Sequence, residues 1–282
     1  MRIVDGKTLG ELLDDRAPIE SPCAMFVAGC DVPAGLRHKV TTPNARAVAA
    51  ATLSLIAAWE SVTAAAVAGH AGDEPAADSG LAVPLAEALG VKCVTVYPGA
   101  EGLPAVMGDD MLLDGTTGLP QALIDGPAPA ARRTAAASAL ATGDLARGDV
   151  RALTMVGGAL APHPVRAHAT VRPTEAVSIW GWSKDEARAS ADALRGKLCG
   201  SFGGKQIIVQ ATDDLERVAR SAGVISCATM SRDPLVRDDW IEPGRHRILA
   251  SGFTPETRET DDASIACAQV YVDTRVGARM AA

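Results

Sequence analysis

Aromatic residues are scarce in this sequence. Its 282 residues include three phenylalanines, two tyrosines and four tryptophans, 3% of the chain, although hydrophobic residues make up 48%. Alanine, valine and leucine must therefore fill the core. A chain of this length can bury a full core, and we expect it to form two lobes.

Positive charge is not in excess either. Lysine and arginine number 27 against 34 acidic residues, for a net charge of −7. Because nucleic-acid binding requires a basic surface, we expect no nucleic-acid partner. Met1–Asp5 lacks the features of a secretory signal, and the most apolar window, 47–69, is alanine-rich and contains Glu60. We therefore expect a cytoplasmic protein with no membrane partner.

Spacings typical of disulfide frameworks and metal sites are missing as well. The six cysteines include no Cys-x-x-Cys pair, and the five histidines show no His-x-x-x-His spacing. We therefore expect reduced cysteines in a cytosolic protein and no metal site.

The most informative stretch that is present runs from Ala152 to His163. It predicts a buried strand over 152–156, a glycine turn at Gly157–Gly158 and a helix through 165–169. Val177–Trp180 predicts a second strand. Such a unit can present backbone N–H groups and a positive helix end to a phosphate, so we predict a dinucleotide-binding turn. An ordinary Gly-Gly loop is the alternative.

Strands and helices continue to alternate downstream of this turn. The pattern predicts strands at 206–209, 224–229, 248–250 and 270–273, and helices that begin at 183–186 and 213–216. This alternation implies a mostly parallel, doubly wound sheet.

The upstream part predicts short strands joined by turns. One strand is expected at 91–97, and a hairpin at 111–124 turns at Gly115–Gly118. Residues 51–59 fit a helix or a strand, and the alternation in Thr-Leu-Ser-Leu-Ile favours a strand. A helical pattern surrounds Leu9.

Two basic features stand out against this background. Lys92 interrupts an apolar strand, so it either reaches the surface or faces a cleft and needs an anion. Arg132 and Arg133 lie near the start of an alanine-rich helix expected at 130–147, where the helix dipole disfavours cations. A ligand anion or a carboxylate from elsewhere would relieve that conflict, and solvation of the arginines is the alternative.

Three segments resemble the ornithine cyclodeaminase/μ-crystallin family: Asp114–Gly126, Arg132–Ala141, and Gly252–Asp262 with its continuation to Arg275. The resemblance covers residues 91–276, and 1–59 weakly. It implies an α/β fold, with a Rossmann-type doubly wound parallel sheet that binds NAD(P) in 129–282 together with its connecting helix. It also implies an N-terminal α+β lobe in 1–128 that binds substrate and forms the dimer contact. The expected assembly is a homodimer.

Within the family, Ala159–His163 and Gly252–Pro255 are most similar to cyclic ketimine reductases. These enzymes reduce Δ1-pyrroline-2-carboxylate, and often Δ1-piperideine-2-carboxylate, to L-proline and L-pipecolate with NADPH or NADH. The resemblance implies that Lys92 and Arg133 are the catalytic residues that clamp the substrate carboxylate, which a bidentate arginine and a point-charge lysine suit. It implies Arg37 as a third anion contact.

Phe253, the remaining expected substrate contact, bears on the reaction type. Ornithine cyclodeaminase-like and alanine dehydrogenase-like members carry aspartate at that position, and phenylalanine cannot transfer protons. Reduction of a preformed imine mainly requires that two reactants be positioned. An ornithine cyclodeaminase-like or alanine dehydrogenase-like enzyme and a non-catalytic NADPH- or ligand-binding protein are the alternatives.

The adenosine ribose of the cofactor is expected near the end of the second strand. An acid there would hold the 2′-hydroxyl of NAD, and Trp180–Lys184 contains none, which favours NADP with NAD as the alternative. Trp182 either stacks on adenine or packs on the surface. The expected cofactor contacts are Gly157, Gly158, Ala161, Trp182, Ser183, Lys184 and Thr229.

The chain departs from the family pattern in four places. The glycine turn is one residue shorter than the family's Gly-Ala-Gly, residues 60–86 look inserted, and the chain ends soon after Arg275. The family's asparagine after the strand that carries the lysine is also missing, with Ala100 and Glu101 nearby. The first departure makes cofactor binding the expectation to test first.

Overall fold

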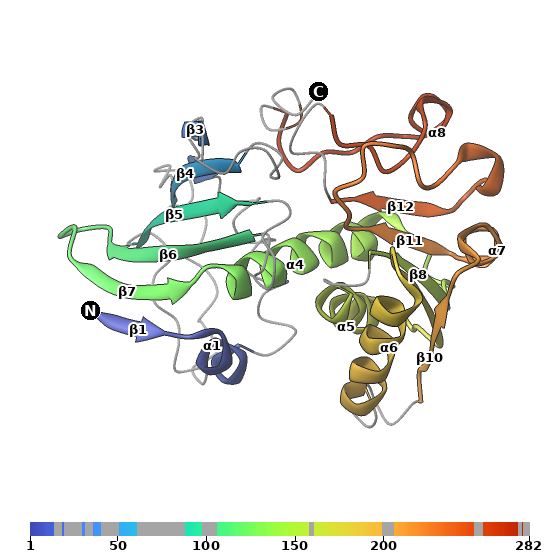
Figure 1. Cartoon of the computed structure of the whole chain (residues 1–282), viewed down its shortest axis with the longest axis horizontal. Coiled ribbons are helices and arrows are strands. Elements are labelled where there is room, and N and C mark those ends of the chain that lie inside the picture. The colour runs from blue at the N-terminus through green and yellow to red at the C-terminus, as the bar shows by residue number, and fades with distance from the viewer. Residues whose placement is uncertain are drawn as a thin grey trace, which may run out of the picture. The chain divides into compact units, whose positions relative to one another are not determined.

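The computed structural model describes residues 1–13, 19, 30–31, 36–40, 51–60, 88–97, 106–157, 161–198, 206–250, 256–275 and 278. The chain divides into two compact units, Met1–Ala130 and Ala131–Ala282, and each is described by itself (Figure 1). The roles expected for the two lobes stay predictions.

The first unit is built on one mixed sheet. Its strand order is β1-β7-β6-β5-β4-β2, and β3 also pairs with β4. The pairs are antiparallel except for β1 with β7. The elements are β1 (Arg2–Val4), α1 (Gly6–Leu12), β2 (Cys30–Asp31), β3 (Leu36–Val40), β4 (Ala51–Glu60), β5 (Ala88–Val96), β6 (Val106–Asp114) and β7 (Pro120–Asp125).

These strands confirm most of what the upstream sequence predicts. The expected strand at 91–97 and the hairpin are present, and 51–59 is strand rather than helix. In the hairpin, Asp114 Oδ1 accepts hydrogen bonds from the Thr117 backbone N–H at 2.7 Å and hydroxyl at 2.8 Å, and Gly118 adopts a φ of +72°. The bonds from Thr117 hold the pKa of Asp114 below its ordinary value. The sequence does not predict β1, because three residues are too few to show an alternation.

The second unit contains an entirely parallel sheet with the order β10-β9-β8-β11-β12. In chain order this is 3-2-1-4-5, the order of a doubly wound dinucleotide-binding sheet. The elements are α4 (Pro127–Leu145), β8 (Ala152–Val156), α5 (Pro162–Val171), β9 (Ala176–Trp180), α6 (Lys184–Leu198), β10 (Ile208–Thr212), α7 (Leu215–Ser221), β11 (Val224–Cys227), the 3-10 turn η2 (Asp238–Trp240), β12 (His246–Leu249) and α8 (Asp262–Ala266).

Helices cover both faces of this sheet. Met155 of β8 packs in one buried cluster with residues of α5 and α6, among them Val165 and Leu194. The next residue, Val156, points the other way into a cluster with Val218 of α7. Strands buried on both faces read as continuous apolar runs, which is why the sequence predicts β8 and β9 closely.

Three expectations for this unit need correction. Residues Val270–Asp273 are not a strand: no described strand pairs with them, and the Tyr271 side chain is 57% exposed. A β-branched and aromatic run favours a strand only where a neighbour supplies partners, so the local pattern misleads here. The third strand begins at Ile208, opposite Ala176 of β9, rather than at Gln206, and β11 ends at Cys227.

Candidate functional site

The neighbouring strands β8 and β11 form the point at which the strand order of the second unit reverses. Val156 and Cys227 are register partners at their carboxyl ends, and the Ala228 N–H donates to the Val156 carbonyl at 2.9 Å. In open α/β sheets, ligands bind outside the carboxyl ends of strands at such a reversal. The candidate site of this unit is therefore the end of β8 and β11.

Gly157 follows β8 and brings two backbone segments together at this point. Its φ is +106°, and its N–H donates to the Trp180 carbonyl at 2.9 Å. A Cβ at Gly157 would overlap the Ala228 carbonyl oxygen and would lie 3.2 Å from Thr229 Cγ2. Only glycine fits this position, since both the backbone angle and the space exclude a side chain.

Helix α5 begins at Pro162, five positions after Gly157. Ala161 is fully buried, and Pro162 occupies the first turn, where a missing N–H costs no helical hydrogen bond. A helix that starts behind a glycine cradle at the sheet reversal fits the pyrophosphate of a dinucleotide. Gly158, the other expected turn residue, lies outside the described residues.

Thr229, after β11, is tied to a buried carboxylate. Glu259 Oε1 accepts hydrogen bonds from the Thr229 backbone N–H at 2.6 Å and from its hydroxyl at 3.0 Å, and Glu259 is only 4% exposed. Both donors of Thr229 are thereby used within the protein. Neither donor is therefore free to bind a cofactor.

The segment that carries Glu259 holds the loop after β11 at several points. The Arg258 N–H donates to the Ser231 carbonyl at 2.7 Å, and the Glu259 carbonyl accepts from the Val236 N–H at 3.0 Å. The sequence did not single out Glu259, because an acid in a loop gives no local sign of burial. Its only signal is its position inside the segment Gly252–Asp262 that carries the family resemblance.

Cys227, the last residue of β11, has a thiol whose pKa is shifted by its surroundings. Burial raises the pKa of its thiol well above the ordinary value, and the Glu259 charge adds to the effect. The thiolate, which is the reactive form, is therefore not populated at neutral pH. Cys227 is a packing residue.

The end of β9 carries the remaining expected cofactor contacts. Trp182 is 63% exposed, and its ring centroid lies 5.6 Å from that of Trp180 with the planes tilted by 60°. The Ser183 hydroxyl accepts from the Glu186 N–H at 3.1 Å and so caps α6, which begins where the sequence predicts a helix. Lys184 Nζ contacts the Asp213 carboxylate from the end of β10.

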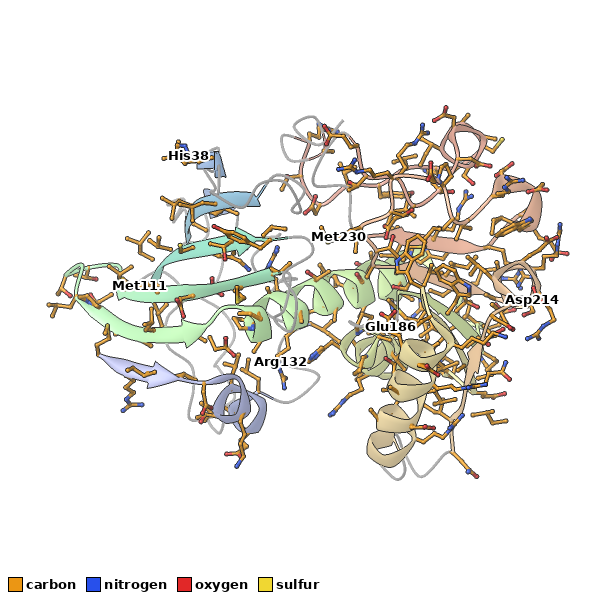
Figure 2. All side chains as sticks on the ribbon, viewed as in Figure 1. His38, Met111, Arg132, Glu186, Asp214 and Met230 are labelled. Atoms are coloured by element: carbon orange, nitrogen blue, oxygen red, sulfur yellow. The ribbon has the colours of Figure 1, made fainter. Side chains whose placement is uncertain are left out.

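The two expected catalytic residues lie in different units. Lys92 is half-buried in β5, and its register partner on β6 is Asp110. Residues directly opposite in antiparallel strands share a face, so the chain itself places a carboxylate beside this lysine. Arg133 is exposed on α4, whereas its neighbour Arg132, labelled in Figure 2, is half-buried. Convergence of Lys92 and Arg133 on one carboxylate stays a prediction.

Two further expectations rest on residues that the structure describes in part or not at all. Arg37 lies in β3 opposite Ser54 of β4, and its side chain is outside the described part. Phe253 lies outside the described residues altogether.

Within the described ranges, no three His, Cys, Asp or Glu side chains gather where they could hold a metal ion. No described helix is long and apolar enough to cross a membrane.

Solved structures of related fold show how far the architecture is shared. The Thermococcus litoralis Δ1-pyrroline-2-carboxylate reductase, in complex with NADH and L-proline, superposes with a TM-score of 0.75 at 24% identity, over 94% of this chain and 73% of that one. An archaeal alanine dehydrogenase dimer with bound NAD gives 0.77 at 20% identity, over 99% and 76%. The expected α/β fold with a doubly wound parallel sheet is confirmed.

Sequence comparison identifies the family. A Δ1-pyrroline-2-carboxylate reductase of Paracoccus denitrificans is 37% identical over 190 residues, 66% of this chain and 58% of that protein. An uncharacterised Schizosaccharomyces pombe protein is 39% identical over 193 residues, 67% of this chain and 57% of its own length. The chain thus spans 57–58% of the length of these relatives. Residues 75–281 match the family profile, and the chain belongs to the ornithine cyclodeaminase/mu-crystallin family.

Proposed function

We propose that this protein is an NAD(P)H-dependent reductase of cyclic ketimine acids. Its substrates are Δ1-pyrroline-2-carboxylate and Δ1-piperideine-2-carboxylate, which it converts to L-proline and L-pipecolate. The observation that carries the proposal is the close approach of Gly157 to Ala228 at the sheet reversal, which fits a dinucleotide. The Paracoccus denitrificans relative, named a Δ1-pyrroline-2-carboxylate reductase, supports the substrate class.

The chemistry asks little of the protein beyond positioning. A bound reduced nicotinamide supplies the hydride that the C2 atom of the protonated imine accepts. Lys92 and Arg133 bind the substrate carboxylate, with Arg37 as a third cation, and thereby fix which face of the ring is presented. Phe253 is the remaining proposed substrate contact, and its side chain has no titratable group, which favours reduction over amine elimination.

The cofactor of the proposal is NADPH, with NADH accepted as well. Gly157, Gly158 and Ala161 border the pyrophosphate, and Ser183 and Lys184 lie where the adenosine 2′-phosphate would be bound. The protein acts as a cytoplasmic homodimer. The related archaeal alanine dehydrogenase is described as a dimer, and the scattered cysteines favour a reducing compartment.

The direct test is an assay of cofactor oxidation by the purified protein with Δ1-pyrroline-2-carboxylate, followed by detection of proline. We expect turnover above the rate without protein, faster with NADPH than with NADH. Folded protein that binds NADPH tightly and reduces neither imine would contradict the proposal and favour a ligand-binding protein. Conversion of ornithine to proline without net cofactor oxidation would instead assign a cyclodeaminase.

A further inference from the structure

An ion pair bridges the ends of two neighbouring strands in the second unit. β9 and β10 are parallel, and Trp180 and Thr212 are register partners at their carboxyl ends. Lys184 begins α6 shortly after β9, and Asp213 follows β10 directly. The Lys184 ammonium contacts the Asp213 carboxylate, although both side chains are largely exposed, at 64% and 60%.

Asp213 is ionised in this arrangement. Its hydrogen bond with Lys184 is the main reason that its pKa lies below the ordinary value. The pair therefore presents one negative and one positive charge at neutral pH. An exposed ion pair of this kind is weak, so a ligand can exchange with either partner.

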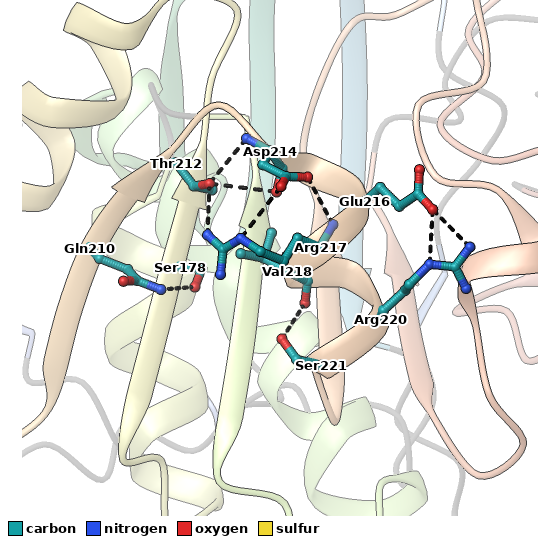
Figure 3. A network of polar contacts seen from close by, with 9 residues as sticks. All are labelled: Ser178, Gln210, Thr212, Asp214, Glu216, Arg217, Val218, Arg220 and Ser221. Carbon is teal, nitrogen blue, oxygen red and sulfur yellow. Dashed lines mark hydrogen bonds and ion pairs between the residues drawn. The ribbon is translucent and has the colours of Figure 1, made fainter.

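Two of the neighbouring charges, Asp214 and Arg217, contact each other. The Asp214 carboxylate caps α7, because its Oδ1 accepts from the Arg217 N–H at 3.0 Å, and its Oδ2 lies 3.4 Å from Arg217 Nε. The Arg217 guanidinium also reaches the Thr212 hydroxyl at 3.4 Å (Figure 3). Asp214 and Arg217 thus engage each other, and Asp213 is the carboxylate at the end of β10 that contacts Lys184.

The ion pair lies at the part of the sheet that contacts the adenosine ribose in dinucleotide-binding folds. In dinucleotide-binding sheets, the residues that follow the second strand read the adenosine ribose: an acid selects the 2′-hydroxyl, and a base accommodates the 2′-phosphate. The second strand here is β9, and Trp180–Lys184 after it contains a base but no acid. The acid comes instead from the end of the adjacent strand.

We propose that Asp213 tunes the cofactor preference by competing with the 2′-phosphate of NADPH for Lys184. This inference rests on the proposed NAD(P)H site. When NADPH binds, Lys184 must exchange the Asp213 carboxylate for the phosphate. When NADH binds, the ion pair stays intact. Asp213 therefore weakens the preference for NADPH that Lys184 alone would create.

The inference is tested by equilibrium titration of the full chain with two fragments that differ in one phosphate, 2′,5′-ADP and 5′-AMP. Asp213→Asn should tighten 2′,5′-ADP by about two- to fivefold, the range set by an exposed charge pair, and leave 5′-AMP unchanged. Lys184→Gln should weaken 2′,5′-ADP selectively. In the double variant the gain from Asp213→Asn should vanish, because no ammonium remains to be released.

Asp192→Asn is the matched control, since it removes an exposed carboxylate that pairs with Arg195 further along α6. It should change neither titration. Equal effects of Asp213→Asn on both fragments, no effect on either, or additivity with Lys184→Gln would each overturn the inference. If the variants respond as predicted but the wild-type protein reduces no imine, the proposed reaction is contradicted and the inference about Asp213 stands. Failure to bind either fragment would overturn both.

Discussion

Glu259 Oε1 accepts two hydrogen bonds from one residue, the backbone N–H and the hydroxyl of Thr229, at 2.6 and 3.0 Å. Thr229 is 6% exposed, so water cannot replace Glu259 as the acceptor for either donor. A carboxylate 30 positions later in the chain therefore fixes the loop that follows β11 at the sheet reversal.

Removal of this carboxylate should destabilise the loop and the cofactor site together. Glu259→Ala leaves the Thr229 N–H buried without its partner, which costs about 1–3 kcal/mol in the free energy of unfolding. Glu259→Gln retains an acceptor oxygen of the same shape and should recover most of that loss. Urea unfolding measures the stability, and NADPH titration of the folded variants measures the site.

The conservative variant distinguishes a positioning role from a merely structural one. If Glu259 positions the loop for the cofactor, the dissociation constant of NADPH should rise in Glu259→Ala and return toward wild type in Glu259→Gln. Unchanged NADPH affinity in a destabilised Glu259→Ala would show that the carboxylate serves stability alone.

Substitution of Gly157 should damage the cofactor site even by one methyl group. Gly157→Ala forces a side chain into a left-handed backbone conformation and against the Ala228 carbonyl, at a cost of about 1–3 kcal/mol. Gly148→Ala is the control, because a Cβ there meets nothing within 4 Å. Thermal unfolding and NADPH titration should separate the two variants, and equal behaviour would argue against the close approach.

Arg133 should affect substrate binding more than the chemical step. Arg133→Ala removes a charge-assisted hydrogen-bond donor, so the KM for Δ1-pyrroline-2-carboxylate should rise by about 10- to 100-fold with a smaller change in kcat. Arg133→Lys keeps the charge without the bidentate geometry, so its KM should lie between those of the wild type and Arg133→Ala. Steady-state kinetics at saturating cofactor gives both constants. An unchanged KM in Arg133→Ala would remove this arginine from the carboxylate clamp.

His168 should make the fold sensitive to acid. It lies fully buried in α5, neither ring nitrogen has a hydrogen-bond partner among the described residues, and burial, aided by the nearby His246, lowers its pKa to about 3. The unfolded chain binds a proton below about pH 6.5, whereas the folded chain does not. Stability is therefore complete above that pH and falls by up to about 1.4 kcal/mol per unit on acidification toward pH 3.

The slope of stability against pH tests this buried imidazole. Urea unfolding between neutral pH and pH 5 should show a smaller slope in His168→Leu than in wild type, whatever the absolute stability of the variant. Identical slopes in the two proteins would count against the assignment.

Sequence reasoning succeeded where local pattern and burial coincide. The apolar run that ends at Val156 predicts a buried strand and Gly157 predicts a turn, and the structure has both a buried strand end and a glycine with positive φ there. It missed features that depend on distant chain segments. The burial of Glu259 arises from a returning loop, and Asp110 lies opposite Lys92 only because two strands pair in that register. Val270–Asp273 looks like a strand but lacks a described partner for its backbone.

The tilted pair of Trp180 and Trp182 makes the end of β9 optically distinctive. Two indoles 5.6 Å apart couple their electronic transitions, and one of them is largely open to water. A nucleotide placed beside Trp182 would change both its emission and the near-ultraviolet circular dichroism of the pair. The protein thus carries its own spectroscopic reporter at the position where we propose that its cofactor preference is set.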